Sequence, residues 1–219
     1  MFIVLEGIDG VGKTTMTQKL SGWFHDNGYI VKNLREPGTT VLGEKIRSII
    51  KDSTIGPTLS HYTLALLMNA ARSENCLEIN DWLESGGVVI ADRFALSTLA
   101  YQGTDNSILD VTSETIKNTI PDLTIILDAD PKDISSRLFN KDREDWLPED
   151  KQDWLDLKSI EEKEKIRDVY KIYGNLSEFS RTTVIINANE PEDMVFNNIL
   201  SVVLKLKNTH ETLSQKPAV

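Results

Sequence analysis

Near the start of the chain, glycines and a lysine are spaced so that they could hold a phosphate. The stretch GIDGVGKTT, residues 7–15, follows an apolar run and matches the pattern G-x-x-x-x-G-K-[ST]. Glycines let backbone N–H groups turn inward around a phosphate, Lys13 can bridge phosphate oxygens, and the Thr14 hydroxyl can ligate Mg²⁺. A helix that follows would aim its positive end at the same anion. The predicted ATP-binding residues are Gly7, Ile8, Asp9, Gly10, Val11, Gly12, Lys13, Thr14 and Thr15.

The loop predicts nucleotide binding but leaves the reaction open. Kinases of small acceptors, GTPases, partition ATPases and motor ATPases all use loops of this kind. The residues that bind an acceptor must therefore be sought elsewhere in the chain.

Short apolar segments alternate with helical patterns along the chain. Strand patterns cover residues 2–6, 29–36, 86–93, 122–130 and 182–188. Helical patterns cover 13–27, 41–51, 58–84, 95–101, 112–119, a stretch opened by Pro131, 158–180 and 191–207. Five strands, each followed by helix, predict the α/β class, with a five-stranded parallel sheet and helices on both faces in three layers.

The sequence has no repeat, low-complexity tract or clear linker, so we expect one domain over residues 1–207. The polar and acidic segment 140–156 is expected to be a mobile insertion. Residues 208–219 have no periodicity and are expected to form a frayed tail.

Charge and cysteine content exclude several classes of function. The net charge of the 219 residues is -10, which argues against nucleic acid as the main partner, although a local basic cluster can still bind a small anion. Cys76 is the single cysteine, so no intrachain disulfide can form and a reducing compartment fits. The apolar run 2–6 is too short for a signal peptide or membrane span, which favours a cytoplasmic location.

Three further stretches carry a more specific pattern than the loop alone. They are REPGTTVLGEKIR at 35–47, LLMNAARSE at 66–74 and DRFALSTLAYQG at 92–103. With these motifs, residues 1–205 resemble the thymidylate kinases, whose hallmarks include REPGGT…GE.IR, LLF.ADR and DRY..S..AYQG. The resemblance implies a P-loop kinase fold with a short lid, ATP and dTMP as substrates, Mg²⁺ as cofactor, and a homodimer built on the long helices.

The resemblance also implies roles at the phosphate and sugar of the acceptor. Arg93 would hold the acceptor phosphate with its planar guanidinium, and Asp92 would assist Mg²⁺ through water. Asp9 would accept a hydrogen bond from the deoxyribose 3′-hydroxyl. Tyr101 would lie where a 2′-hydroxyl would project and so select deoxyribose.

At the base, the resemblance implies that Arg72 donates to O4 and that Ser97 and Gln102 face the ring. Glu36 and Pro37 would shape the acceptor pocket. Arg47 and Arg35 would be further contacts to the bound anion.

The chain departs from the family pattern close to the acceptor. Met68 stands where the family usually has an aromatic residue that stacks on thymine, and a methionine covers the face of a ring with softer geometry. Ala71 replaces the usual Asp or Asn, and Thr39-Thr40 replaces Gly-Thr. These changes leave the kinase prediction intact but allow a broader or altered base preference.

The family has two ways of supplying a catalytic arginine. Gly10 follows the loop aspartate, which resembles the style in which a mobile lid supplies the arginine. The lid would then be 140–156, where Arg143 lies in KDRED, similar to the family's DRIE. Lys141 and Arg137 are the other candidate lid cations. With Lys13, Arg93 and Asp9, Arg143 completes the predicted catalytic set.

The predicted reaction transfers the γ-phosphoryl group of Mg·ATP to the 5′-phosphate of dTMP. One alternative is a kinase of another or a modified deoxynucleoside monophosphate. A kinase acting on a nucleotide within DNA is a third possibility, and the acidic charge counts against it. A non-catalytic P-loop ATPase comes from a different class and leaves the motif at 92–103 unexplained.

Overall fold

The computed structural model describes residues 1–134, Trp154 and 158–214, with 209–214 as backbone only. At its centre is one sheet of five strands: β1 (Phe2–Glu6), β2 (Val31–Arg35), β3 (Val88–Asp92), β4 (Leu123–Asp128) and β5 (Thr183–Asn187). The strands lie in the order β2-β3-β1-β4-β5, and every neighbouring pair is parallel. The α/β class and the parallel sheet expected from the sequence are confirmed.

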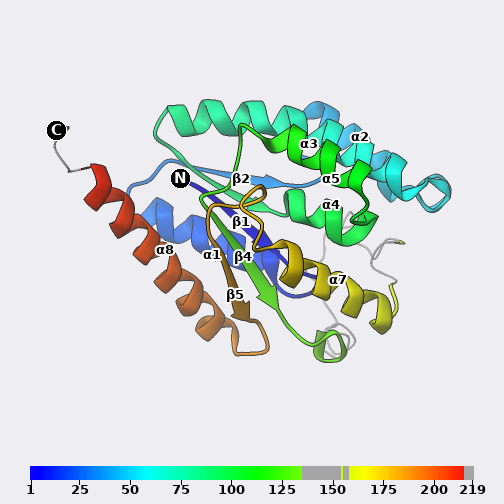
Figure 1. The fold of residues 1–219 in the computed structure, drawn as a ribbon. Helices are drawn as coiled ribbons and strands as arrows, with labels where there is room; N and C mark the ends of the chain where they lie inside the picture. The colour runs from blue at the N-terminus through cyan, green and yellow to red at the C-terminus, as the bar shows by residue number, and fades with distance from the viewer. Residues whose placement is uncertain (135–153, 155–157, 215–219) are drawn as a thin grey trace.

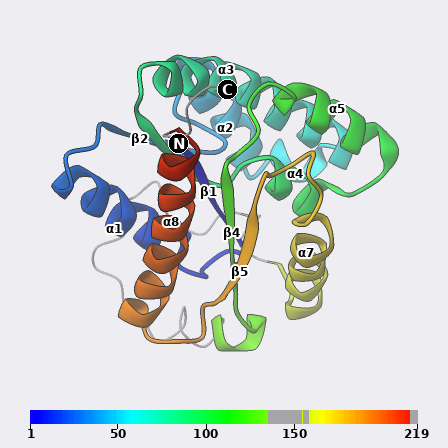
Figure 2. The ribbon, with the colours of Figure 1, turned by 60° about the vertical axis from the view of Figure 1, so that its left-hand side comes forward.

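The helices form a layer on each face of this sheet (Figures 1 and 2). One face carries α1 (Lys13–Asp26) and α8 (Glu192–Ser214). The other carries α3 (His61–Glu84), α4 (Ala95–Gln102), α5 (Asn106–Ile116) and α7 (Ile160–Tyr173). The helix α2 (Val41–Lys51) packs against α3, and the 3₁₀ helix η1 (Gly56–Thr58) lies between them in the chain.

The register of the sheet brings the loop ends together. Leu5 pairs with Asp92 and Glu6 pairs with Ile126, so β1, β3 and β4 end at the same edge. The phosphate loop after β1 and the Arg93 segment after β3 therefore lie next to each other. In open α/β sheets, ligands bind at such carboxyl edges.

The sheet and the two helical layers enclose the hydrophobic core. All residues of β1 and β3 are buried, because helices cover both faces of these central strands. Within the described ranges, no helix has the length and apolar character needed to cross a lipid bilayer.

Two helices begin at places that differ from the expected ones, because polar caps set their starts. The pattern predicted a helix from residue 58, but α3 begins at His61. Ser60 caps this helix, because its side chain accepts a hydrogen bond from the Thr63 N–H. The helix α5 begins at Asn106, earlier than the expected residue 112, with Asp105 as its cap.

The ends of two other helices also differ from expectation. The helix α7 stops at Tyr173, where Gly174 follows, and does not run to residue 180. The helix α8 continues to Ser214, so the expected end near 207 is wrong and part of the expected tail is helical. The predicted lid 140–156 lies outside the described residues except for Trp154, whose indole N–H donates to the Ile50 carbonyl at 2.8 Å.

Candidate active site

The loop between β1 and α1 has the geometry that a bound phosphate requires. Gly7 has φ +141°, and a Cβ there would meet the Leu127 carbonyl oxygen at 2.6 Å, so only glycine fits. Gly12 has φ +101° and immediately precedes α1. The Lys13 ammonium donates to the carbonyls of Gly7 and Ile8, at 3.0 Å each. The lysine is therefore held against the loop, at the positive end of α1.

The other predicted loop residues divide between core and surface. Ile8 and Val11 are buried and anchor the loop in the core, whereas Gly10 is exposed with φ +81°. Thr15 is half-buried in the first turn of α1. The buried side chains of Ile8 and Val11 therefore anchor the loop, while its backbone at Gly10 is exposed to solvent.

A hydroxyl and a carboxylate meet at the mouth of the loop. The exposed Thr14 donates from Oγ1 to Asp92 Oδ2 at 2.5 Å. Two hard oxygen atoms beside a phosphate loop fit Mg²⁺, which typically takes one or two protein ligands together with water and phosphate oxygens. Among the described residues, no three His, Cys, Asp or Glu side chains are grouped to hold a metal by themselves.

Arg93 is the centre of the second part of the site. It has φ +74°, an unfavourable backbone region for arginine, and its N–H donates to the Leu5 carbonyl at 3.0 Å. Its guanidinium pairs with Asp9 and lies 3.2 Å from the Tyr101 hydroxyl, which itself donates to Asp9 at 2.6 Å. Three predicted acceptor residues, from the phosphate loop, the segment after β3 and α4, are therefore in direct contact.

Two residues that the sequence analysis missed hold this arginine. Glu6 and Tyr170 are both fully buried, one at the end of β1 and the other on α7. The Tyr170 hydroxyl lies 3.1 Å from Arg93 Nη1 and 2.9 Å from Ser97 Oγ, and Ser97 donates to Glu6 at 2.6 Å. Neither Glu6 nor Tyr170 belongs to a motif with a recognised spacing, so only the fold could reveal them.

Ser97 is used differently from the expectation that it faces the base. Its hydroxyl donates to Glu6 and lies within 3.0 Å of both Arg93 Nη1 and Tyr170. A hydroxyl has one donor and two acceptor positions, and these three contacts fill them. Ser97 therefore orients Arg93 and has no hydrogen bond left for a base.

Charge and burial set the protonation states in this cluster. Burial, with the nearby Arg93 cation, lowers the pKa of Lys13 to about 8. Burial alone would raise the pKa of Asp9, but the Arg93 and Lys13 cations outweigh it and the pKa of Asp9 is lowered. The carboxylate of Asp9 is thus ionised at neutral pH and pairs with the Arg93 guanidinium.

Arg72 lies at the other end of the site and is completely buried. Its Nε donates to Glu36 Oε2 at 2.8 Å, and its Nη2 lies 2.8 Å from the same oxygen. Nη1 donates to Asn69 Oδ1 at 2.8 Å, and Nη2 donates to the Phe94 carbonyl at 3.0 Å. Burial raises the pKa of Glu36 although Arg72 opposes this shift. Two residues that were predicted separately, Arg72 and Glu36, are thus in direct contact, and Asn69 is a third member that was not expected.

Two oxygens on α4 are buried without a hydrogen-bond partner in the described structure. They are Thr98 Oγ1 and Gln102 Oε1, four residues apart and so on one face of the helix. A buried polar atom without a partner is rare in native proteins, so these two oxygens are candidate acceptors of hydrogen bonds from a ligand or a water molecule. Gln102 was expected at the base, whereas Thr98 was missed although it lies in the same motif.

The remaining predicted residues lie on β2, α2 and α3 or outside the described residues. Met68 is mostly buried and packs in a small apolar cluster with Ile46, Ile50, Leu64 and Ala71. Arg47 donates to the Pro37 carbonyl at 3.0 Å, which fixes the loop after β2. Arg35 lies 3.7 Å from Glu44. The lid candidates Arg143, Lys141 and Arg137 lie outside the described residues.

A phosphate loop and the Arg93 cluster share one edge of a parallel sheet, an arrangement typical of P-loop kinases that act on a small phosphorylated acceptor. The family model for thymidylate kinase matches residues 5–199. The chain is 37% identical over 210 residues to the thymidylate kinase of Geobacillus sp. (strain WCH70), which covers 93% of this chain and 95% of that protein. It is 36% identical to that of Thermosipho africanus, over 94% and 98%, and 35% identical to that of Mycoplasma capricolum, over 98% and 100%.

The chain therefore belongs to the thymidylate kinase family. Membership makes it an ATP-dependent nucleoside monophosphate kinase, a phosphotransferase, and confirms the resemblance carried by its motifs.

Proposed function

We propose that this enzyme transfers the γ-phosphoryl group of Mg·ATP to the 5′-phosphate of dTMP and releases dTDP and ADP. The observation that carries the proposal is the contact of Arg93 with both Asp9 and the Gly7 carbonyl, at 3.2 Å for the latter. This contact sets an anion-binding guanidinium directly beside the loop that would hold ATP. Two phosphates bound at these two places would face each other, as the transfer requires.

The protein needs to supply little covalent chemistry in this reaction, because the acceptor phosphate is already an anion. The task is to bring two repelling phosphates into line and to neutralise charge on the group in transfer. Lys13 would do so from the donor side and Arg93 from the acceptor side. We assign no side chain the role of general base or nucleophile.

Magnesium would be held by Thr14 directly and by Asp92 through water, together with phosphate oxygens. It would supply charge neutralisation on the ATP phosphates. The oxygen pair of Thr14 and Asp92 at the loop mouth supports this assignment.

The contacts to the nucleoside follow from the same arrangement. Asp9 would receive the 3′-hydroxyl and Tyr101 would exclude a 2′-hydroxyl, and their mutual hydrogen bond supports a shared place at the sugar. Arg72 and Gln102 would contact the base, and Met68 would cover its face. Arg143 would reach the transferring group from the lid 140–156, and Glu36 and Pro37 would shape the pocket.

The experiment that tests the reaction offers one acceptor at a time with Mg·ATP and measures ADP release. The acceptors are dTMP, dUMP, dGMP, dCMP, dAMP and the ribose analogue of dTMP. We expect a strong preference for dTMP over dCMP and over the ribose analogue. Faster turnover of another deoxynucleotide would keep the mechanism and replace the substrate, and Met68 and Ala71 are the residues that would explain it. Absence of any acceptor-dependent release would refute the kinase reaction.

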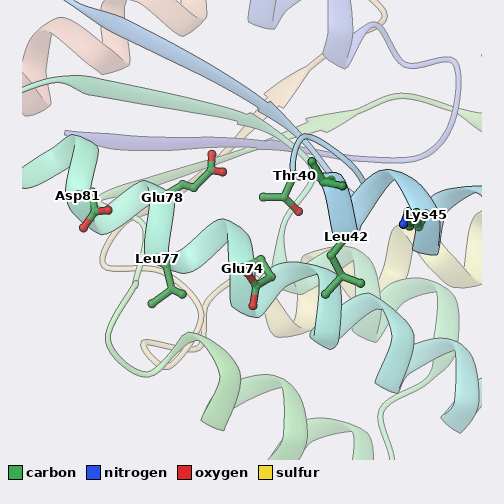
Figure 3. Close-up of a pocket in the computed structure, with 8 residues that line it drawn as sticks. Thr40, Leu42, Lys45, Glu74, Leu77, Glu78 and Asp81 are labelled. Atoms are coloured by element: carbon green, nitrogen blue, oxygen red, sulfur yellow. The ribbon is translucent and has the colours of Figure 1, made fainter.

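The groove between α2 and α3 supports a homodimer (Figure 3). It measures about 550 Å³, and Leu42 and Leu77 line it with exposed fractions of 45% and 63%. Tyr62 and Leu66 extend the apolar surface along α3. We propose that a second copy covers this face, because four large apolar side chains are exposed on these two neighbouring helices, beside the charged Lys45, Glu74, Glu78 and Asp81 of the groove. Light scattering should give twice the chain mass, and Leu77→Glu should give the monomer. A wild-type monomer at tens of micromolar would overturn the proposal.

The acidic net charge of -10 supports small-molecule nucleotides as the partners and not nucleic acid or a membrane surface. We propose a cytoplasmic location on the same ground together with the single cysteine, Cys76, whose thiol is free.

A further inference from the structure

Glu6 is a buried carboxylate beside the phosphate loop that has no role in the reaction proposed above. It is the last residue of β1, is completely buried and immediately precedes Gly7. A carboxylate is rarely buried in this way unless other groups compensate for its lost hydration. In the described structure its hydrogen bonds go to the segment that follows Arg93, which indicates a task at that arginine.

One carboxylate oxygen holds the backbone next to Arg93. Glu6 Oε1 accepts from the Phe94 N–H at 2.8 Å and from the Ser97 N–H at 3.2 Å. Phe94 immediately precedes α4 and its side chain makes no capping hydrogen bond, so Glu6 supplies the cap from β1. Arg93 has φ +74°, and this cap helps to hold it in that unfavourable conformation.

The other carboxylate oxygen fixes the direction of the hydrogen bonds that reach the guanidinium. Glu6 Oε2 accepts from Ser97 Oγ at 2.6 Å, which uses the only proton of that hydroxyl. Ser97 must therefore accept from the Tyr170 hydroxyl, at 2.9 Å, and from Arg93 Nη1, at 3.0 Å. Because Tyr170 gives its proton to Ser97, it too can only accept from Arg93 Nη1, at 3.1 Å. Both hydroxyls present acceptors to Arg93 because Glu6 is itself an acceptor.

The groups around Glu6 favour this acceptor state. Burial raises the pKa of Glu6, while the Ser97 hydroxyl, the Arg93 cation and the Phe94 N–H act in the opposite direction. The Arg93 side chain is 14% exposed, so the buried network orients a side chain that is still partly open to solvent.

We propose that Glu6 is a positioning residue for phosphoryl transfer, whose carboxylate sets, through Ser97 and Tyr170, the orientation in which Arg93 meets the acceptor phosphate. This inference rests on the proposed role of Arg93 at that phosphate. A guanidinium binds phosphate best through two parallel N–H bonds, so its affinity depends on its orientation. A hydroxyl proton turned toward Nη1 would set two donors against each other and release the guanidinium from this orientation.

Glu6→Gln reverses one hydrogen bond and keeps the shape of the side chain. The two backbone N–H groups can only donate, so they hold the amide oxygen at the place of Oε1 and leave the amide NH₂ facing Ser97 Oγ. We expect the KM of dTMP to rise about tenfold. The KM of ATP should stay within about twofold of wild type, because the loop and Lys13 are assigned to ATP. Steady-state ADP release measures both constants, and equal changes in the two would leave Glu6 a structural residue.

Glu6→Gln in a Ser97→Ala background tests the route of the effect. Ser97→Ala alone should raise the KM of dTMP about threefold, because Nη1 loses one acceptor. Without the Ser97 hydroxyl, the amide NH₂ no longer faces a hydroxyl proton, so adding Glu6→Gln should change this KM less than about twofold. A tenfold rise that persists in this background would show that Glu6 does not act through Ser97 and would overturn the inference.

The matched control is Asp122→Asn, which makes the same change from carboxylate to amide. Asp122 also accepts a backbone N–H of β1, from Phe2 at 2.8 Å, but at the other end of the strand. This variant should leave both constants unchanged even if the melting temperature falls. A rise in the KM of dTMP here would show that lost stability alone produces the effect, and the inference would be wrong.

Arg93→Lys separates this inference from the proposed role of Arg93. If Arg93→Lys raises the KM of dTMP and Glu6→Gln does not, Arg93 binds the phosphate without Glu6, and the inference alone is overturned. If Arg93→Lys leaves that KM at the wild-type value, Arg93 does not hold the acceptor phosphate, and both ideas are overturned.

Discussion

The two ends of this active site are built in different ways. At the phosphate end, the cradle is mostly backbone: Gly7 and Gly12 adopt φ values that favour glycine, and Lys13 is held by two loop carbonyls. At the base end, the cradle consists of side chains from several elements. Glu36 follows β2, Asn69 and Arg72 come from α3, and the Phe94 carbonyl precedes α4.

This difference explains where the chain departs from its family. A backbone cradle depends on a few glycines in a short motif, and the chain keeps them all. A side-chain cradle can be rebuilt one residue at a time, and Met68 and Ala71 both lie at that end. The phosphate end should therefore set the rate for every acceptor, and the base end should set the choice among them.

The largest expected effect comes from the phosphate end. Lys13→Met removes the cation at the donor phosphates while keeping the length of the side chain, and we expect kcat to fall about 10³-fold for all acceptors alike. Steady-state ADP release measures this. The matched control, Lys19→Met, changes a half-buried lysine of α1 that pairs with Glu192 and should retain wild-type kcat. A loss restricted to one acceptor would break the division between the two ends.

Alkylation of Cys76 on α3 tests how tightly the base end of the site is packed. Burial raises the pKa of the Cys76 thiol to about 11, and the Glu36 carboxylate adds to the shift. Because the ordinary value is 9.0, the native thiolate at pH 8 is about 100-fold scarcer than in an unfolded chain. The rate of iodoacetamide alkylation should fall at least by that factor and rise about tenfold for each pH unit below 11. Urea-unfolded protein is the reference, and equal native and unfolded rates would show that this end is open.

A smaller effect is expected from α7. Tyr170→Phe removes the hydroxyl that contacts Arg93 and Ser97, and we expect kcat/KM to fall about tenfold for dTMP and for dCMP alike. Tyr173→Phe on the same helix is the control and should change neither value. If Tyr170→Phe altered the preference between the two acceptors, Arg93 would take part in choosing the base.

The smallest effect concerns Met68. Because Met68 packs with Ile46 and Ile50, the volume-conserving Met68→Leu should keep the pocket wall in place. We expect kcat/KM for dTMP and dCMP to change less than about threefold, with the ratio unaltered. A tenfold change in that ratio, measured in the same assay, would mean that the sulfur itself contacts the base.

The sequence was sufficient for the sheet, the phosphate loop and the family, because these depend on local patterns. Periodicity located all five strands, and the spacing of Gly7, Gly12 and Lys13 located the loop. It was insufficient where contacts join distant segments. Tyr170 reaches Ser97 across 73 residues and Asn69 reaches Thr112 across 43, and no local pattern signals either contact. The contacts of the Ser97 hydroxyl with Glu6 and Tyr170 could not be predicted for the same reason.

One double-mutant cycle tests most directly whether the two ends act separately. It measures kcat/KM for dTMP in wild type, Tyr170→Phe, Asn69→Leu and the double variant. Tyr170 and Asn69 share no hydrogen-bond partner in the described structure, so the account predicts that the two fold-losses multiply within about twofold. A double variant no worse than the poorer single variant would show that the two residues act as one unit, which would contradict the separation of rate from choice.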